Sequence, residues 1–547
     1  MENKQNPIVV TSLGKLEGKW SKSGDFAQFY GIPFAKPPVG ERRWKPPEPI
    51  GSWQGTRKAH KHSAQASQRG NEMKGFLNDL LDGVGHGWLK RTFLKLLLKI
   101  LPTPKESEDC LYLNIVTPDP SSNGKRPVMV WIHGGDHQAG NSADPYYVDG
   151  KLASQEIVFV SINYRLGLMG YMAHPELSAE SEHGVSGNYG TLDQIAALKW
   201  IKQHIHNFGG DPDNITIFGE SAGGDSVAYM MISPLAKGLF HKAILQSPSN
   251  MGHMFHLRSR YGYFESSEQQ GVNYAKAAGV TGENQIARLR KMSTSELQAL
   301  CNSTKSDLGY FYPTVDGHII PDMPAAVFQR GEQAKVPVML GCTRDEGTLF
   351  YSLFESPFTE CRFEDLRGDN MERILKEEFQ TDYSKLLELY PGIDKRDRKA
   401  EVELFGHTVF TVKIRYYAEA LKASGTDPFV YMFSWYPNSK TQSIGAFHAS
   451  ELCFMHGTES PLVPFTDADR KLSVKMVSYW TRFAKTGNPN GEGLPDWESF
   501  DSDNPRWLDI RKNSVEMADS DFEKRYAILK PRLLRQLEHS RDSRKQF

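Results

Sequence analysis

The chain has 547 residues and a formal net charge of −1, so it can form one large domain with insertions or two or three domains, and nothing in its charge indicates a nucleic-acid partner. Its five cysteines are odd in number, widely spaced and without a C-x-x-C pair, which argues against a disulfide framework or a zinc site. Because the first residues lack the apolar core of a signal peptide and no apolar run is long enough to span a bilayer, we expect a cytoplasmic protein.

Short β-type runs and turns open the chain. Residues 8–10 and 15–18 predict a hairpin, and residues 29–35 predict a strand that runs into a Pro/Gly-rich turn at 37–40. No catalytic group stands out in this part of the sequence.

The segment 71–104 reads as an amphipathic helical insertion. Apolar residues recur at helical spacing beside a basic stripe, with Leu89, Phe93, Leu96, Leu97 and Ile100 in the first set and Arg91, Lys95 and Lys99 in the second. Three interpretations stay open. The helix can pack on the body as a surface helix, form a lid over a lipophilic pocket, or contact a membrane surface reversibly through residues 88–101.

A fully apolar run, Pro127–Ile132, predicts a strand at the centre of a parallel sheet. It leads into a Gly-rich loop at 133–140, which can turn backbone N–H groups toward the oxyanion that forms in acyl transfer. Residues 157–165 then predict another buried strand, and residues 188–206 a long helix. This alternation predicts an α/β fold with a mostly parallel sheet, whose ligands bind at the carboxyl ends of the strands.

The run TIFGESAGG at 216–224 predicts a strand, a tight turn and a helix. Ser221 lies at the turn in a Gly-x-Ser-x-Gly motif, where Gly219 and Gly223 leave room for its Oγ to stand clear. The helix that follows points its N-terminus at the serine and favours negative charge there. An ordinary Gly-rich turn needs neither a strand before it nor a helix after it, and here both are predicted. Ser221 is therefore the expected nucleophile.

Nine short motifs, spread over nearly the whole chain, carry a family resemblance. They are EDCLYLN at 108–114, WIHGG at 131–135, NYR at 163–165, NFGGDP at 207–212, TIFGESAGG at 216–224, VDG at 315–317, TRDEG at 343–347, GAFH at 445–448 and WTRFAKTGNPN at 480–490. In these motifs and their order the chain resembles the type-B carboxylesterase and cholinesterase family of α/β hydrolases. The resemblance implies one α/β-hydrolase domain over 1–547, in which helical segments at 250–310 and 355–425 form the walls of an active-site gorge.

A serine nucleophile needs a histidine base and a carboxylate that orients the histidine. In this fold the order along the chain is serine, acid, histidine, but spacing alone does not choose among the candidates after Ser221. The resemblance selects Glu346 in TRDEG, rather than Asp345, and His448 in GAFH. The other histidines that we considered are interpreted as structural or surface residues: His204, His206, His241 and His456.

The resemblance also assigns the oxyanion hole to the backbone N–H groups of Gly135, Asp136 and Ala222. The family usually has a small residue and then an aromatic one where this chain has Asp136 and His137. Three roles for the Asp136 carboxylate stay open: a hydrogen bond within the loop, positioning of water or proton acceptance in deacylation, or repulsion of anionic substrates. His137 can pair with Asp136 or with Gln138, and either residue can position substrate or water.

Two supporting features follow from the resemblance. Glu108 and Arg165 are expected to form a buried ion pair behind the site. Cys110 occupies a position that is disulfide-bonded to an upstream cysteine in secreted members, and this chain has no cysteine before it. That difference agrees with an intracellular bacterial protein.

The sequence therefore predicts a serine carboxylesterase that cleaves neutral lipophilic esters through an acyl-enzyme. Ser221 attacks, His448 takes and returns the proton, and Glu346 orients His448, with no metal or organic cofactor and a small-molecule ester as the partner. One alternative is an amidase, carbamate hydrolase or thioesterase with the same triad. A more distant alternative is a non-catalytic cholinesterase-like binding protein. The ester and the oligomeric state stay open.

Overall fold

The structure is a computed structural model of the chain. It describes residues 5–69, 72–100, 105–121, 125–147, 150–249, 254–260, 265–303, 307–349, 370–460 and 463–544. Parts of the predicted segments 71–104, 250–310 and 355–425 lie outside the described residues, and so does Cys361.

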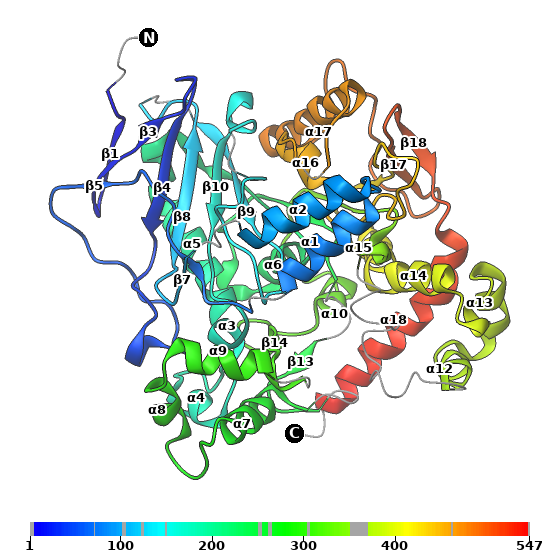
Figure 1. Cartoon of the computed structure of the whole chain (residues 1–547), viewed down its shortest axis with the longest axis horizontal. Helices are drawn as coiled ribbons and strands as arrows, with labels where there is room; N and C mark the ends of the chain where they lie inside the picture. The colour runs from blue at the N-terminus through cyan, green and yellow to red at the C-terminus, as the bar shows by residue number, and fades with distance from the viewer. Residues whose placement is uncertain are drawn as a thin grey trace.

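An eleven-stranded mixed sheet forms the centre of the molecule (Figure 1). Its middle is parallel and consists of β10 (Val158–Ile162), β9 (Arg126–Ile132), β11 (Gly210–Glu220), β12 (Lys242–Gln246), β15 (Val338–Thr343), β16 (Phe429–Phe433) and β17 (Arg506–Ile510). Antiparallel strands complete the two edges: β8 (Tyr112–Thr117), β4 (Ala27–Pro33) and β3 (Lys19–Trp20) beside β10, and β18 (Val515–Asp519) beside β17. The predicted α/β class with a mostly parallel sheet is confirmed.

Both faces of the parallel strands are buried, which explains why their sequences are apolar throughout rather than alternating. Successive side chains of a strand point to opposite faces. Val130 of β9 belongs to one hydrophobic cluster and its neighbour Met129 to another. The first cluster contains residues of α5 (Tyr189–His204), α6 (Ala222–Ile232), α10 (Pro324–Gln329), α15 (Val412–Ala423) and α18 (Glu523–Arg544). The second contains residues of α16 (Leu452–His456) and α17 (Asp467–Thr486).

Further helices surround this core, and the predicted helical segments contain most of them. The described part of 250–310 holds α7 (Ser267–Ala277), α8 (Gln285–Arg290) and α9 (Thr294–Ser303), which form a hydrophobic cluster of their own with α3 (Gly167–Tyr171) and α4 (Pro175–Glu180). The described part of 355–425 holds α12 (Asn370–Phe379), α13 (Tyr383–Leu389), α14 (Arg398–Gly406) and α15. Figure 1 shows α7 to α9 and α12 to α14 at opposite sides of the molecule.

Short strands complete the structure. The predicted opening hairpin is confirmed as β1 (Ile8–Thr11) and β2 (Gly14–Glu17), to which β5 (Thr56–Lys58) adds in parallel. Two further parallel pairs are β6 (Gln65–Ala66) with β7 (Glu106–Ser107), and β13 (Phe255–His256) with β14 (Thr314–Val315).

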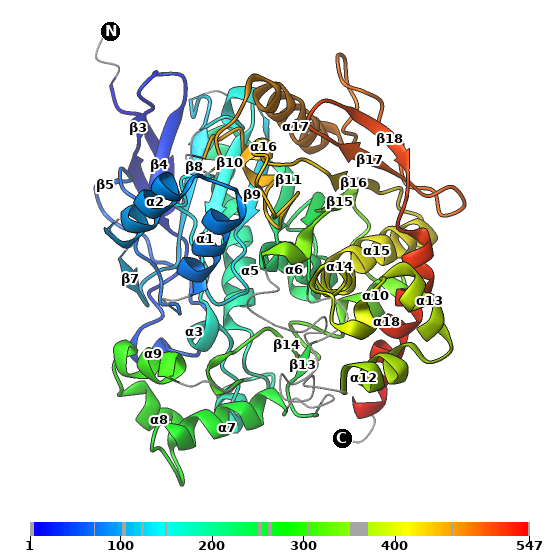
Figure 2. The ribbon, with the colours of Figure 1, turned by 45° about the vertical axis from the view of Figure 1, so that its right-hand side comes forward.

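The insertion at 71–104 forms two helices, α1 (Glu72–Gly83) and α2 (Trp88–Ile100), which lie side by side at the surface (Figures 1 and 2). The break between them contains Gly85 and Gly87, and Gly85 has a φ of +78°, a left-handed conformation that ends a helix at little cost for glycine. Among the described residues, no helix has the length and apolar character needed to cross a membrane.

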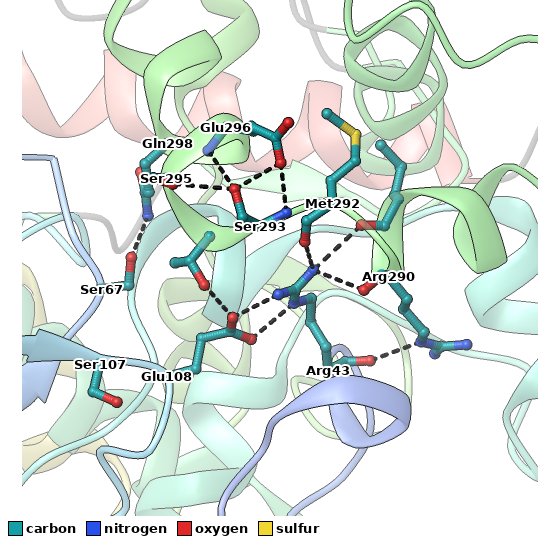
Figure 3. A network of polar contacts seen from close by, with 12 residues as sticks. Arg43, Ser67, Ser107, Glu108, Arg290, Met292, Ser293, Ser295, Glu296 and Gln298 are labelled. Atoms are coloured by element: carbon teal, nitrogen blue, oxygen red, sulfur yellow. Dashed lines mark hydrogen bonds and ion pairs between the residues drawn. The ribbon is translucent and has the colours of Figure 1, made fainter.

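The predicted ion pair between Glu108 and Arg165 is wrong. Arg165 forms two 2.7 Å bonds with the carboxylate of Asp193 on α5. Glu108 instead binds Arg43 at 2.6 and 2.8 Å, as Figure 3 shows. Each guanidinium can bind one carboxylate through two parallel hydrogen bonds. The four charged groups are therefore paired as Arg43 with Glu108 and Arg165 with Asp193. Arg43 also donates to the backbone carbonyl of Met292 at 2.8 Å, which ties the N-terminal segment to the α8–α9 junction.

Candidate active site

Ser221 lies in a strained turn between β11 and α6. Its backbone has φ 57° and ψ −126°, a conformation that residues other than glycine rarely adopt. Its N–H donates to the carbonyl of Gln246 at 2.9 Å, which holds the turn against β12. A methyl group on Gly223 would lie 2.1 Å from the carbonyl oxygen of Ile132, and one on Gly219 would lie 2.5 Å from the carbonyl carbon of Gly223. The glycines of the motif are therefore needed for the backbone to turn so sharply.

His448 and Glu346 meet as the sequence predicts, with Nδ1 of His448 2.5 Å from Oε2 of Glu346. The other carboxylate oxygen, Oε1, accepts from the backbone N–H of Thr343 at 2.8 Å and from the Ser247 hydroxyl at 2.6 Å. Asp345, the neighbour that the sequence analysis sets aside, accepts instead from the backbone N–H of Ala446 at 2.8 Å. Glu346 is thus held at the end of β15 with its acceptor aimed at His448.

A second carboxylate, which the sequence analysis did not select, faces the other nitrogen of His448. Oε1 of Glu220 lies 3.0 Å from Nε2, and both side chains are buried. Glu220 is part of the quoted TIFGESAGG motif, but nothing in the motif shows that the side chain before the serine turns toward a histidine over 200 positions away. Among the described contacts, no hydrogen bond joins Nε2 to Ser221 Oγ; such bonds are often long or poorly aligned before substrate binds.

The two carboxylates change the titration of His448. Burial by itself lowers the pKa of an imidazole, but the charges of Glu220 and Glu346 outweigh it and raise the pKa of His448 well above its usual value. A third carboxyl lies nearby, since burial and the charges of Glu220 and Glu346 raise the pKa of Glu451 to about 8. Two carboxylates, Glu220 and Glu346, thus face the two nitrogens of His448, while the raised pKa of Glu451 favours its protonated form at neutral pH.

This charge arrangement predicts how activity depends on pH. Only the neutral imidazole can accept a proton from serine, so activity rises as the pH passes upward through the pKa of His448. Replacing Glu220 with glutamine removes one of the charges that raise this pKa. The acid limb of kcat/KM for a neutral ester should then move to lower pH. A pH–rate profile measures the shift, with the exposed Glu332→Gln as the control. An acid limb that stays in place would show that Glu220 does not set the pKa of the base.

The loop after β9 lies against the serine. A methyl group on Gly134 would lie 3.2 Å from Cβ of Ser221, and Gly135 has a φ of +102°. In the part of the chain that the structure describes, the backbone N–H groups of Gly135 and Ala222 have no hydrogen-bond acceptor. Ala222 is the first residue of α6, where the helix leaves its N–H groups unpaired. Two backbone N–H donors are thus available near Ser221, one from the loop after β9 and one from the first residue of α6.

Asp136 is exposed, and its Oδ2 accepts a 2.7 Å hydrogen bond from the hydroxyl of Tyr312, a residue far outside the loop. The ring of Tyr312 is nearly parallel to two other aromatic rings, with centroids 6.0 Å from Phe255 and 6.2 Å from Tyr310. The guanidinium of Arg69 lies 3.8 Å from the centroid of Tyr310 and extends this row. A row of aromatic rings therefore lies beside the loop at 133–140, and Tyr312 in this row binds the carboxylate of Asp136.

His137 is fully buried, and the predicted pairing with Asp136 or Gln138 is wrong for the described contacts. Nδ1 of His137 lies 3.5 Å from the hydroxyl of Tyr171, while Gln138 donates to the carbonyl of Phe311 at 2.7 Å. The imidazole packs against the ring of Tyr229, and burial lowers its pKa to about 3. The left-handed backbone of His137, with φ 55°, turns the side chain into the core.

The other histidines lie in different surroundings. His456 packs among Trp131, Tyr147, Phe159 and Phe218, and His204 against Trp200. His206 is exposed, and His241 accepts from the backbone N–H of Ile215. Their interpretation as structural or surface residues agrees with these positions.

Comparison with known proteins gives one consistent family. The model of the carboxylesterase family matches residues 5–529. The para-nitrobenzyl esterase of Bacillus subtilis (strain 168) is 33% identical over 535 residues, which cover 95% of this chain and 98% of that protein. The fumonisin B1 esterase of Sphingopyxis macrogoltabida is 33% identical over 503 residues, with 90% and 84% covered.

Solved structures agree with this result. A para-nitrobenzyl esterase structure superposes with a TM-score of 0.76 at 31% identity and covers 96% of this chain and 99% of its own. A carboxylesterase of Geobacillus stearothermophilus gives a TM-score of 0.76 at 29% identity, with 95% and 99% covered. The likeness therefore extends over nearly the full length of both chains.

Proposed function

The chain belongs to the carboxylesterase family and is a carboxylic ester hydrolase with the α/β-hydrolase fold, and from this premise we propose that it works through an acyl-enzyme on Ser221. In the proposed roles, Ser221 is the nucleophile, His448 the general base and acid, and Glu346 the carboxylate that orients His448. The backbone N–H groups of Gly135, Asp136 and Ala222 form the oxyanion hole.

The observation that carries this proposal is the joint placement of a strained serine turn and a buried His448–Glu346 pair at 2.5 Å. Ser221 Oγ attacks the ester carbonyl while Nε2 of His448 takes its proton, and the negative oxygen that forms is stabilised by the backbone donors. His448 then returns the proton to the leaving alcohol. In the second half, water attacks the acyl group and the same imidazole transfers its proton to Ser221.

We propose that the preferred esters are neutral and lipophilic. Two buried carboxylates, Glu220 and Glu346, flank His448, and Asp136 adds an exposed carboxylate on the loop at 133–140. An anionic substrate would be repelled by these groups, whereas the aromatic row at Phe255, Tyr312 and Tyr310 offers apolar contact. The four described cysteines are free thiols, and on that ground we also propose a cytoplasmic location.

The proposed function is tested by comparing p-nitrophenyl butyrate with p-nitrophenyl hemiglutarate, an ester of similar length with a negative charge. The wild type should hydrolyse the neutral ester at least about tenfold faster in kcat/KM, as expected for one uncompensated charge contact. Ser221→Ala should hydrolyse neither. Faster cleavage of the corresponding p-nitroanilide than of the ester would instead favour the amidase alternative.

For Asp136 we propose water positioning in deacylation, because its exposed carboxylate is fixed by Tyr312 next to the oxyanion loop. Asp136→Gly should then give a p-nitrophenol burst followed by slow turnover, with deacylation slowed at most about 10²-fold, the lower end of the range for acid–base catalysis, because His448 remains as the base. Tyr312→Phe leaves the carboxylate but removes its donor and should give a smaller effect in the same direction. If Asp136→Gly deacylates as fast as the wild type, the carboxylate affects specificity rather than deacylation.

A further inference from the structure

The outer face of α2 is an exposed apolar surface. The exposed fractions are 67% for Trp88, 68% for Leu89, 63% for Phe93 and 57% for Leu96. In the described ranges the other exposed large apolar side chains lie elsewhere and form no larger group: Ile8 and Val10 on β1, Val39, Tyr436, and Val474 on α17. Single exposed apolar residues need no explanation, whereas a contiguous group marks an interaction surface.

The inner face of the α1–α2 pair packs against the rest of the protein. Leu94 of α2 is buried and belongs to the same hydrophobic cluster as Leu80, Leu81 and Val84. A helix that only packs on a protein body presents polar residues to solvent on its other side. Here the second side is apolar as well, so the packing of the α1–α2 pair does not explain Trp88, Leu89, Phe93 and Leu96.

The charge of α2 indicates what covers this face. Its thirteen residues include four basic residues and no acidic one. Lys90 is exposed, while Lys95 and Arg91 lie 2.7 and 3.5 Å from Asp82 of α1, at the border of the apolar face. An apolar face bordered by basic side chains is complementary to a lipid surface with negative headgroups. We propose that α2 docks this protein in the plane of an anionic lipid surface.

Docking would bring that surface close to the proposed catalytic loop. The backbone carbonyl of Gly83 accepts from the N–H of Ser443 at 2.9 Å, and that of Gly85 accepts from the hydroxyl of Thr441 at 3.1 Å. The segment from 441 continues directly to His448, and the carbonyl of Ile444 accepts from Thr348, two residues after Glu346. This step rests on the proposed function: the docked protein would hydrolyse a lipophilic ester that is dissolved in the lipid.

Vesicle sedimentation tests the proposal with the full-length protein. Vesicles of phosphatidylcholine with phosphatidylglycerol should bind the wild type, and binding should weaken with added salt or with phosphatidylcholine alone. The double variant Phe93→Ser, Leu96→Ser should lower the partition coefficient at least about tenfold, since it removes two large apolar side chains from the contact. Val474→Ser is the matched control, because Val474 is equally exposed, at 67%, on α17; it should bind like the wild type.

Three results would overturn the docking proposal. Binding by the double variant equal to that of the wild type would exclude the apolar face, and equal binding to both vesicle types would exclude the charge requirement. Concentration-dependent dimerisation that the double variant abolishes, without vesicle binding, would assign the face to a second copy of the chain. Hydrolysis of p-nitrophenyl acetate in solution should be unchanged in the double variant. A wild type that binds vesicles but hydrolyses no ester would refute the proposed function and leave the docking intact.

Discussion

Replacing His448 with alanine should lower kcat/KM for p-nitrophenyl butyrate about 10⁴-fold or more, the loss typical for a triad base. Without the imidazole, nothing in the site can take the proton of Ser221 as it attacks. Nδ1 of His448 binds Glu346 at 2.5 Å, so Nε2 is the nitrogen that must exchange a proton with serine, although Glu220 lies 3.0 Å from it. The binding of a neutral ester does not depend on this exchange, so the loss should appear mainly in kcat.

The same substitution also leaves Glu220 and Glu346 without the positive charge between them. Like charges at short range destabilise the folded state, and the melting temperature must therefore be measured beside the activity. His448→Gln keeps a hydrogen-bond donor for the carboxylates and should fold at least as well as the alanine variant while remaining inactive. The exposed His206→Ala is the control. A His448→Gln variant with more than a tenth of the wild-type activity would refute the assignment of the base.

The second large effect is expected at the oxyanion loop. A methyl group on Gly135 would lie 2.2 Å from the carbonyl oxygen of Ala139, and the residue has a φ of +102°. Gly135→Ala must therefore shift the loop and its N–H donor. Losing one oxyanion donor typically lowers kcat about 10²- to 10³-fold, and the loss should be the same for short and long acyl chains.

Gly24→Ala is the control for Gly135→Ala. It shows how much stability is lost when a glycine with positive φ is replaced and no loop is displaced. Gly24 has a φ of +80° but nothing within 4 Å of the added methyl group. It should therefore lower the free energy of unfolding slightly and leave kcat unchanged. If Gly135→Ala keeps the wild-type kcat while its stability falls as in Gly24→Ala, the loop does not supply the oxyanion donors.

Those parts of the candidate site that local motifs encode could be predicted from the sequence. The Gly-x-Ser-x-Gly turn follows from steric limits within five residues, and the structure reproduces it at Ser221. Glu346 and His448 are more than 100 residues apart along the chain. Spacing could not select them, and only the family resemblance did. The buried strands could also be predicted, because parallel strands that are covered on both faces are apolar throughout.

Features that depend on tertiary contacts could not be predicted in the same way. The approach of Glu220 to Nε2 of His448, and the bond from Tyr312 to Asp136, each join residues from distant parts of the chain. The expected pairing of Glu108 with Arg165 shows the difficulty: packing places Arg43 against Glu108 and Asp193 against Arg165, and no local motif encodes either contact. The helical periodicity quoted for the insertion covers α2, and the separate helix α1 before Gly85 was not predicted.

The central claim is that Ser221 is the nucleophile that carries the acyl group, and covalent labelling of this serine tests it most directly. The protein would be treated with a neutral p-nitrophenyl alkylphosphonate, which leaves a stable adduct on an active-site serine, and its peptides analysed by mass spectrometry. We expect one mole of p-nitrophenol per mole of protein, an adduct on the peptide that contains Ser221, and no adduct in Ser221→Ala. An adduct on another residue, or ester turnover that survives in Ser221→Ala, would contradict the account.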